Sequence, residues 1–110
     1  MAEVLTEIEE LRRRIDVVDD QLIRLLNVRV ACALEIGRLK HDASMPIYDP
    51  EREKRVLTLV QEAATKLSGP LEAEATVRIF ERIIDEARRA ERIAAEKRNE
   101  SGTEKREQPW

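Results

Sequence analysis

Residues 6–41 read TEIEELRRRIDVVDDQLIRLLNVRVACALEIGRLKH, and this stretch decides the fold. Its apolar residues recur at alternating steps of three and four, which places them on one face of an α-helix. They are Ile8, Leu11, Ile15, Val18, Leu22, Leu25, Cys32, Ile36 and Leu39. Thr6 and Glu9 form a capping-box pattern, and no proline interrupts the stretch. The pattern predicts one helix of about 35 residues, about 50 Å long.

Two shorter helices are predicted after a polar loop. Residues 49–51 combine an N-cap aspartate, a proline at the first helical position and an early acid, and Ser-Gly-Pro at 68–70 ends the helix that they begin. Apolar spacing then predicts a third helix from near Leu71 to a point before Asn99. The sequence lacks strand-like alternation of useful length, so the expected fold class is all-α.

The C-terminal residues differ in composition from the rest of the chain. Residues 96–110 carry dense mixed charge without apolar periodicity, so they cannot bury enough apolar surface to order themselves. We therefore predict one domain over residues 1–95 and a disordered charged tail over residues 96–110, with Trp110 at its loose end.

Charge and composition exclude several classes of partner. The net charge of −3 mixes both signs along the chain, so neither a nucleic-acid surface nor a polybasic membrane face is indicated. The N-terminus lacks the basic and apolar regions of a signal peptide, and no apolar run approaches the roughly 18 residues that span a bilayer. The single cysteine, Cys32, cannot form an internal disulfide. We expect a cytoplasmic protein.

The long helix predicts a homodimer. Two shorter helices cannot cover both flanks of an apolar helix about 50 Å long, and the uncovered patch would exceed what soluble monomers usually expose. The simplest solution is an intertwined homodimer, in which the long helices pair antiparallel about a two-fold axis.

Two cations interrupt the predicted apolar face of the long helix. The three-four repeat predicts an apolar residue at position 29, but Arg29 stands there, and a buried guanidinium needs a partner. Lys40 lies on about the same face, and the small residues Ala33 and Gly37 between them leave a hollow. Alternatively, Arg29 meets a carboxylate of a neighbouring helix and Gly37 only eases packing.

The third helix carries a similar interruption at Glu91. The stripe before it consists of Phe80, Ile84 and Ala87. An acid at the next position of this stripe faces inward, so it lines a site or forms a structural salt bridge with Arg29 or Lys40.

Further charges gather at the start of the second helix and on the first. Asp49, Arg52 and Glu53 begin the second helix, whose N-terminus favours an anion, although ordinary capping and surface charge would also explain them. Arg12 lies about 25 Å along the helix from Arg29, too far for both to hold one small ligand. In an antiparallel dimer the partner's Arg12 would come alongside; alternatively, Arg12 belongs to a solvated basic run.

These segments resemble the AroQ, or type II, family of chorismate mutases. Three of them occur in the family's order: LRRRIDVVDDQLIRLLNVR at 11–29, EIGRLK at 35–40 and PIYDPERE at 46–53. Residues 69–87, GPLEAEATVRIFERIIDEA, are similar to the third helix of members joined to the enzyme that opens the shikimate pathway. The resemblance covers about residues 8–92.

The resemblance implies an isomerase that rearranges chorismate to prephenate in phenylalanine and tyrosine biosynthesis. Arg12 of one protomer and Arg29 of the other would hold the two substrate carboxylates, and Lys40 would face the breaking ether oxygen. Because the reaction is a unimolecular pericyclic rearrangement, no metal or other cofactor is expected.

The resemblance also assigns the remaining pocket residues. Asp49, Arg52 and Glu53 match the segment that lines the pocket, with Glu53 as the expected partner of the substrate hydroxyl. Ala87 and Glu91 depart from the best-known bacterial pattern of a serine and then a glutamine. Ala87 loses a hydrogen bond to a carboxylate. Glu91, like the glutamate of fungal relatives, must be protonated to donate a hydrogen bond to the ether oxygen.

Two other functions stay open at this point. An isochorismate-pyruvate lyase uses the same fold and carboxylate clamp, and a non-catalytic, mutase-like regulatory helical dimer is also compatible. Retention of Arg12, Arg29, Lys40, Arg52 and Glu53 favours the mutase. A shikimate-pathway enzyme as an activating partner stays open too.

Overall fold

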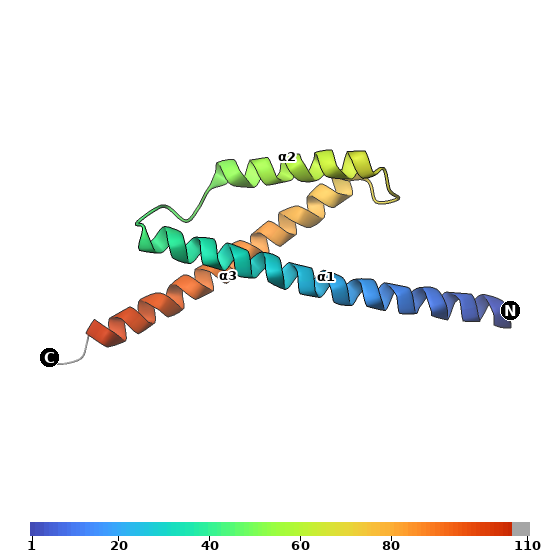
Figure 1. The fold of residues 1–110 in the computed structure, drawn as a ribbon, viewed down its shortest axis with the longest axis horizontal. Helices are drawn as coiled ribbons and strands as arrows, with labels where there is room; N and C mark the ends of the chain where they lie inside the picture. The colour runs from blue at the N-terminus through green and yellow to red at the C-terminus, as the bar shows by residue number, and fades with distance from the viewer. Residues whose placement is uncertain (107–110) are drawn as a thin grey trace. The chain divides into compact units, whose positions relative to one another are not determined.

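The computed structural model describes the backbone of residues 1–106 and the side chains of residues 1–99. Within these residues the chain is entirely helical apart from its turns. The helices are α1 (Ala2–Asp42), α2 (Pro50–Leu67) and α3 (Ala73–Arg106) (Figure 1). The all-α prediction of one long helix and two shorter ones is therefore confirmed.

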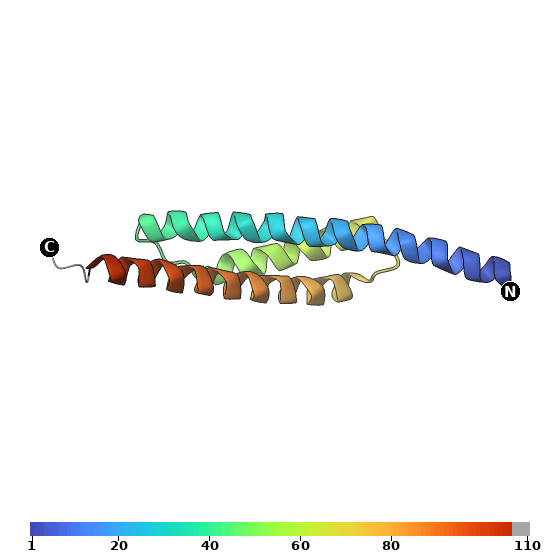
Figure 2. The same cartoon turned by 90° about the horizontal axis from the view of Figure 1, so that it is seen from below.

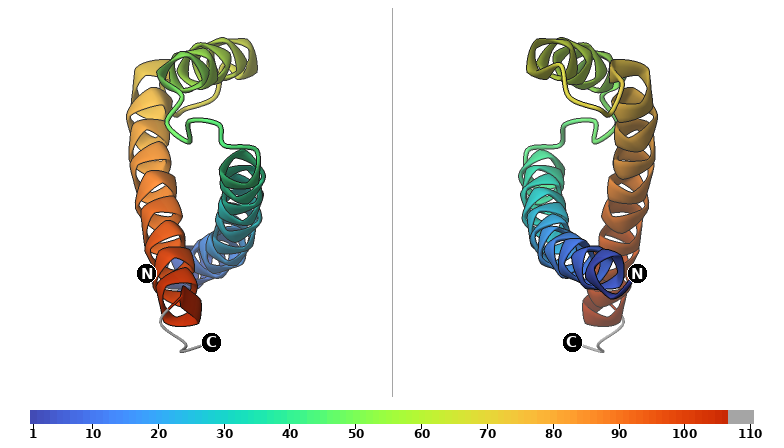
Figure 3. Two further views of the ribbon diagram at one scale, coloured as in Figure 1. Left: turned by 90° about the vertical axis from the view of Figure 1, so that its left-hand side faces the viewer. Right: turned by 90° about the vertical axis from the view of Figure 1, so that its right-hand side faces the viewer.

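The chain divides into two compact units, Met1–Cys32 and Ala33–Trp110. The first unit is the N-terminal part of α1. The second unit contains the last turns of α1 together with α2 and α3, and α2 packs against α3. Figures 2 and 3 show α2 (green) lying along the first turns of α3 (yellow).

The ends of α2 follow the predicted capping signals. Asp49 is the N-cap, with its side chain accepting a hydrogen bond from the backbone N–H of Arg52, and Pro50 occupies the first helical position. Ser68 ends the helix in the left-handed conformation, with φ of 49°, and its N–H bonds to the carbonyl of Ala64 at 3.2 Å. These caps fix where α2 begins and ends.

The start of α1 differs from the prediction. The helix already begins at Ala2, and the Thr6 hydroxyl donates to the Ala2 carbonyl at 3.0 Å. Thr6 is therefore a residue of the helix interior, and the predicted capping box with Glu9 is wrong. The reason is that residues 2–5 contain good helix formers, so the helix extends past the first possible cap.

The end of α3 also lies further along the chain than predicted. The helix continues to Arg106, whereas the apolar spacing predicts an end before Asn99, so α3 includes the first residues of the segment predicted as a disordered charged tail. Adding a residue to a formed helix costs little, and Glu, Lys and Arg are good helix formers, so the charged sequence can continue without apolar periodicity. Trp110 and the rest of residues 107–110 lie outside the described residues.

Large apolar side chains of the N-terminal unit are exposed in the single chain. Leu11, Ile15 and Leu25 have exposed fractions of 54%, 57% and 65%, and many of their apolar neighbours on α1 are exposed as well. In the second unit, by contrast, Ile84 and Ala87 on α3 are buried, at 7% and 6%.

None of the described helices is long and apolar enough to cross a membrane.

Candidate functional site

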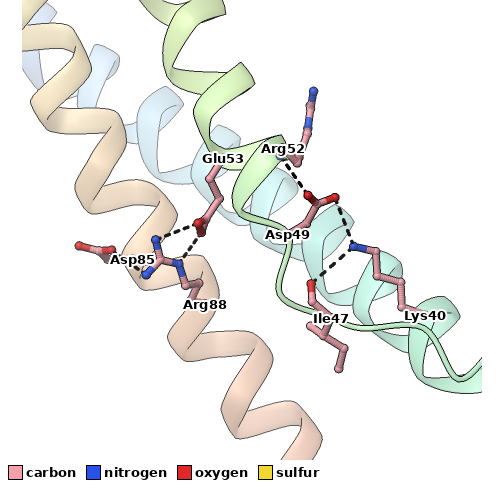
Figure 4. Close-up of polar contacts among 7 residues, drawn as sticks. All are labelled: Lys40, Ile47, Asp49, Arg52, Glu53, Asp85 and Arg88. Carbon is pink, nitrogen blue, oxygen red and sulfur yellow. Dashed lines mark hydrogen bonds and ion pairs between the residues drawn. The ribbon is translucent and has the colours of Figure 1, made fainter.

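Lys40 lies in the last turn of α1 and contacts the loop that leads into α2. Its ammonium nitrogen lies 3.9 Å from a carboxylate oxygen of Asp49 and 3.5 Å from the carbonyl oxygen of Ile47, to which it donates (Figure 4). The Lys40 side chain is 21% exposed. The loop therefore folds back over the end of α1 and holds the ammonium group at the start of α2.

Asp49 has two partners because its two carboxylate oxygens face in different directions. Oδ1 accepts from the backbone N–H of Arg52 at 3.1 Å, and Oδ2 is the oxygen that faces Lys40. The Arg52 guanidinium points away from Lys40 and Glu53 (Figure 4). The structure thus brings Lys40 and Asp49 together, but it leaves the Arg52 side chain outside their contact.

Glu53, one turn into α2, is joined to α3 by a residue that the sequence did not single out. Arg88 donates to both carboxylate oxygens of Glu53: Nε bonds to Oε1, and Nη2 bonds to Oε2 at 3.0 Å (Figure 4). Glu53 is 21% exposed and Arg88 is 48% exposed. The hydrogen bond with Glu53 is the main cause that raises the pKa of Arg88.

Two further groups surround the Arg88 guanidinium. Its Nη1 lies 3.5 Å from a carboxylate oxygen of Asp85, one turn earlier on α3. Its central carbon lies 5.9 Å from the centroid of the Tyr48 ring, within the range of a cation–π contact. Arg88 therefore links α3 to the loop before α2 and to α2 itself. Arg88 stands four residues after Ile84 of the inward stripe, and this helical spacing is the sequence signal that could have indicated its place.

Three of these charged groups act on Glu91 of α3: Lys40, Glu53 and Arg88. It is partly buried, and a Cβ atom at Gly37, the buried glycine of α1, would lie 4.0 Å from the Glu91 Cγ. Burial is the main cause that raises the pKa of Glu91 above its ordinary value. Lys40 and Arg88 act in the opposite direction by their positive charge, and the charge of Glu53 raises the pKa further.

Four charged side chains of the second unit thus act on one another electrostatically. We call this set, Lys40, Glu53, Arg88 and Glu91, the charged cluster; α1, α2 and α3 each contribute to it. Ala87, buried one turn before Glu91, contributes a methyl group to the α3 stripe. No salt bridge joins Glu91 to Lys40 among the side chains of residues 1–99, so the alternative of a direct structural pair is not supported.

Arg12 and Arg29 belong to the other unit, Met1–Cys32. Arg12 is exposed and donates to Glu9, one turn earlier on α1, at 2.9 Å. Arg29 lies on the same helix, about 25 Å further along.

Among the described residues, no group of three His, Cys, Asp or Glu could hold a metal ion.

Comparison with known families decides the identity of the fold. A family model described as chorismate mutase type II matches residues 11–92. The chain belongs to this family. The match includes every member of the charged cluster, from Lys40 on α1 to Glu91 on α3, and the resemblance inferred from the sequence motifs is confirmed.

Individual chorismate mutase relatives agree with this assignment. The chain is 37% identical to the bifunctional chorismate mutase/prephenate dehydratase of Aquifex aeolicus over 81 residues, which are 73% of this chain and 22% of that protein. It is 24% identical to the chorismate mutase of Methanocaldococcus jannaschii over 82 residues, 74% of this chain and 81% of that protein. The chain thus spans about a fifth of the length of the bifunctional curated relatives that it matches.

A solved chorismate mutase structure has a similar fold. The chorismate mutase of Thermus thermophilus aligns with a TM-score of 0.72 and 31% sequence identity, over 78% of this chain and 94% of that chain. The fold of this chain is therefore shared with a solved chorismate mutase.

Proposed function

We propose that this chain is a chorismate mutase, which rearranges chorismate to prephenate in the biosynthesis of phenylalanine and tyrosine. The observation that carries the proposal is the charged cluster, which lies inside the segment matched by the chorismate mutase type II model. The names of the relatives from Aquifex aeolicus and Methanocaldococcus jannaschii point to the same reaction.

The electrostatics of Lys40 and Glu91 suit the transition state of this rearrangement. As the carbon–oxygen bond breaks ahead of carbon–carbon bond formation, negative charge builds on the ether oxygen. An ammonium group and a protonated carboxyl that both donate hydrogen bonds to this oxygen would stabilise the transition state more than the bound substrate. The raised pKa of Glu91 keeps its proton to higher pH than for an ordinary glutamate, which supports the role of donor.

We assign the two substrate carboxylates to arginines on α1. Arg29 of one protomer and Arg12 of the other would clamp them in an antiparallel homodimer, and the clamp would select the folded substrate whose reacting carbons are close. The exposed apolar face of α1 in the single chain supports this dimer, because a second copy would cover it. Asp49, Arg52 and Glu53 would line the remainder of the pocket, with Glu53 accepting from the substrate hydroxyl.

The direct test follows the loss of chorismate absorbance with purified protein. Wild type should consume chorismate and form prephenate, whereas Arg29→Ala should lower kcat/KM by about a hundredfold or more, because a charged carboxylate contact is lost. Arg24→Ala is the matched control, since Arg24 is an exposed α1 arginine paired with Asp20. Absence of turnover by wild type, or equal losses in both variants, would contradict the proposal.

Isochorismate-pyruvate lyase remains the second candidate, because the same fold and carboxylate clamp serve that reaction. Assaying isochorismate beside chorismate with the same preparation separates the two activities. A non-catalytic regulatory dimer would turn over neither substrate. We place the enzyme in the cytoplasm, and a shikimate-pathway enzyme that activates it would appear as a gain in kcat/KM on mixing.

A further inference from the structure

Arg88 is the part of the charged cluster to which the proposed mechanism gives no role. It binds Glu53 through two parallel hydrogen bonds, from Nε to one carboxylate oxygen and from Nη2 to the other. This fork geometry fixes direction as well as distance, because the planar guanidinium matches both oxygens of a carboxylate at once. The Glu53 carboxylate therefore cannot rotate while Arg88 holds it.

The guanidinium itself is held from two further sides. Asp85 lies 3.5 Å from Nη1 on the same helix, and the Tyr48 ring lies 5.9 Å from the central carbon. Three different elements thus determine where the fork points: α3, α2 and the loop before α2. Nearly half of the Arg88 side chain is exposed, and exposed ion pairs contribute little to folding stability. The contacts that hold Arg88 are therefore better explained by a role in orienting Glu53 than by a contribution to folding stability.

We propose that Arg88 is a positioning residue: by holding both oxygens of Glu53, it fixes the direction in which this carboxylate accepts a hydrogen bond from the hydroxyl of the bound substrate. Each carboxylate oxygen has a second lone pair, so the fork leaves acceptor capacity for one ligand hydroxyl. The inference deepens the proposed function and rests on it, because it takes over the assignment of Glu53 to the substrate hydroxyl.

The charge of Arg88 also acts on Glu91, which provides an independent readout. The groups around Glu91 are Lys40 on α1, Glu53 on α2 and Arg88 on α3, and the charge of Arg88 lowers the pKa of Glu91. Removing that charge should move the basic limb of the kcat/KM profile to higher pH. A lysine at position 88 keeps the charge but loses the fork, so it should leave the limb in place without restoring the orientation of Glu53.

The experiment compares Arg88→Met, Arg88→Lys and the control Arg89→Met, which removes the neighbouring exposed arginine of α3. We expect Arg88→Met to lower kcat/KM about tenfold to a hundredfold, mainly through KM, because the hydroxyl contact exists in both bound substrate and transition state. Arg88→Lys should keep most of this loss, and Arg89→Met should stay within about twofold. Thermal melting checks that every variant is folded.

A double-mutant cycle with Glu53→Gln decides whether Arg88 acts through Glu53. If it does, Arg88→Met should cost little further activity in the Glu53→Gln background. An active wild type with additive losses, or an unchanged pH profile in Arg88→Met, overturns the inference and leaves the proposed function standing. A wild type without mutase activity overturns both.

Discussion

A Cβ atom added to Gly37 of α1 would lie 4.0 Å from the Cγ of Glu91 on α3, an ordinary van der Waals separation. Gly37 is buried, and Lys40 follows one turn later on the same helix. The glycine therefore keeps the space beside the partly buried Glu91 free of side chain. A ligand oxygen between Lys40 and Glu91 would need such a space. A larger residue at position 37 could therefore stabilise the helix and yet weaken ligand binding.

Substitution of Gly37 should reveal this conflict. Gly37→Ala adds one methyl group at an acceptable distance and removes the poor helix propensity of glycine, so the free energy of unfolding should rise by about 0.5–1 kcal/mol. Gly37→Leu should fill the space beside Glu91 and lower kcat/KM at least about tenfold. Urea unfolding and steady-state kinetics measure the two effects. Full activity of a folded Gly37→Leu protein would show that the space is not part of the site.

Glu91 should give the activity a distinctive pH dependence. Burial raises its pKa, so the protonated donor persists above the ordinary range for glutamate and is lost as pH rises through the raised value. The kcat/KM of wild type should therefore fall as pH increases, and Glu91→Gln, a donor at every pH, should flatten the profile. The measurement is a pH–rate profile between about pH 5 and 8. A wild-type profile that is already flat over this range would exclude the protonated carboxyl.

The sequence predicted the helices and much of the charged cluster, because periodicity and capping are local signals. The alternating apolar steps predicted α1, and the Asp-Pro-Glu start predicted the N-cap that Asp49 forms. Lys40 and Glu91 are charges that interrupt apolar stripes of the sequence, and in the structure the positive charge of Lys40 lowers the pKa of Glu91. Their roles in binding and catalysis stay predictions.

The pairing of Arg88 with Glu53 could not be predicted in the same way. Arg88 lies beside the α3 stripe, and Glu53 lies 35 residues earlier in the chain, so no helical spacing relates Arg88 to Glu53. The real start of α1 and end of α3 were missed for a different reason. Sequence shows where a helix can begin or end, but good helix formers such as Glu, Lys and Arg let the helix continue past such points.

Asp49 combines a structural and an electrostatic role that two substitutions can separate. Asp49→Ala removes the cap of α2 and should lower the free energy of unfolding by about 1 kcal/mol. Asp49→Asn keeps an N-cap acceptor, so most of this stability should remain, but the negative charge 3.9 Å from Lys40 is lost. Thermal unfolding of both variants tests the cap. Equal destabilisation by alanine and asparagine would show that the charge, and not the cap, stabilises the start of α2.

The proposed shared site predicts complementation between two inactive variants. Arg12→Ala and Arg29→Ala chains should each form dimers without a complete carboxylate clamp. In a heterodimer of the two, one of the two sites receives its Arg12 from one chain and its Arg29 from the other, so that site is intact. Random pairing of equal amounts should therefore restore about a quarter of wild-type activity.

The complementation is measured after the two variants are refolded together from denaturant, with chorismate consumption as the readout. The matched control refolds Arg12→Ala with the double variant Arg12→Ala/Arg29→Ala. No pairing in that mixture supplies an intact Arg12, so no activity should return. Recovery near a quarter in the first mixture alone would assign the two arginines of one site to different protomers. If the first mixture stays as inactive as the control, Arg12 and Arg29 do not meet in a site shared between protomers, and the antiparallel pairing of α1 proposed here is wrong.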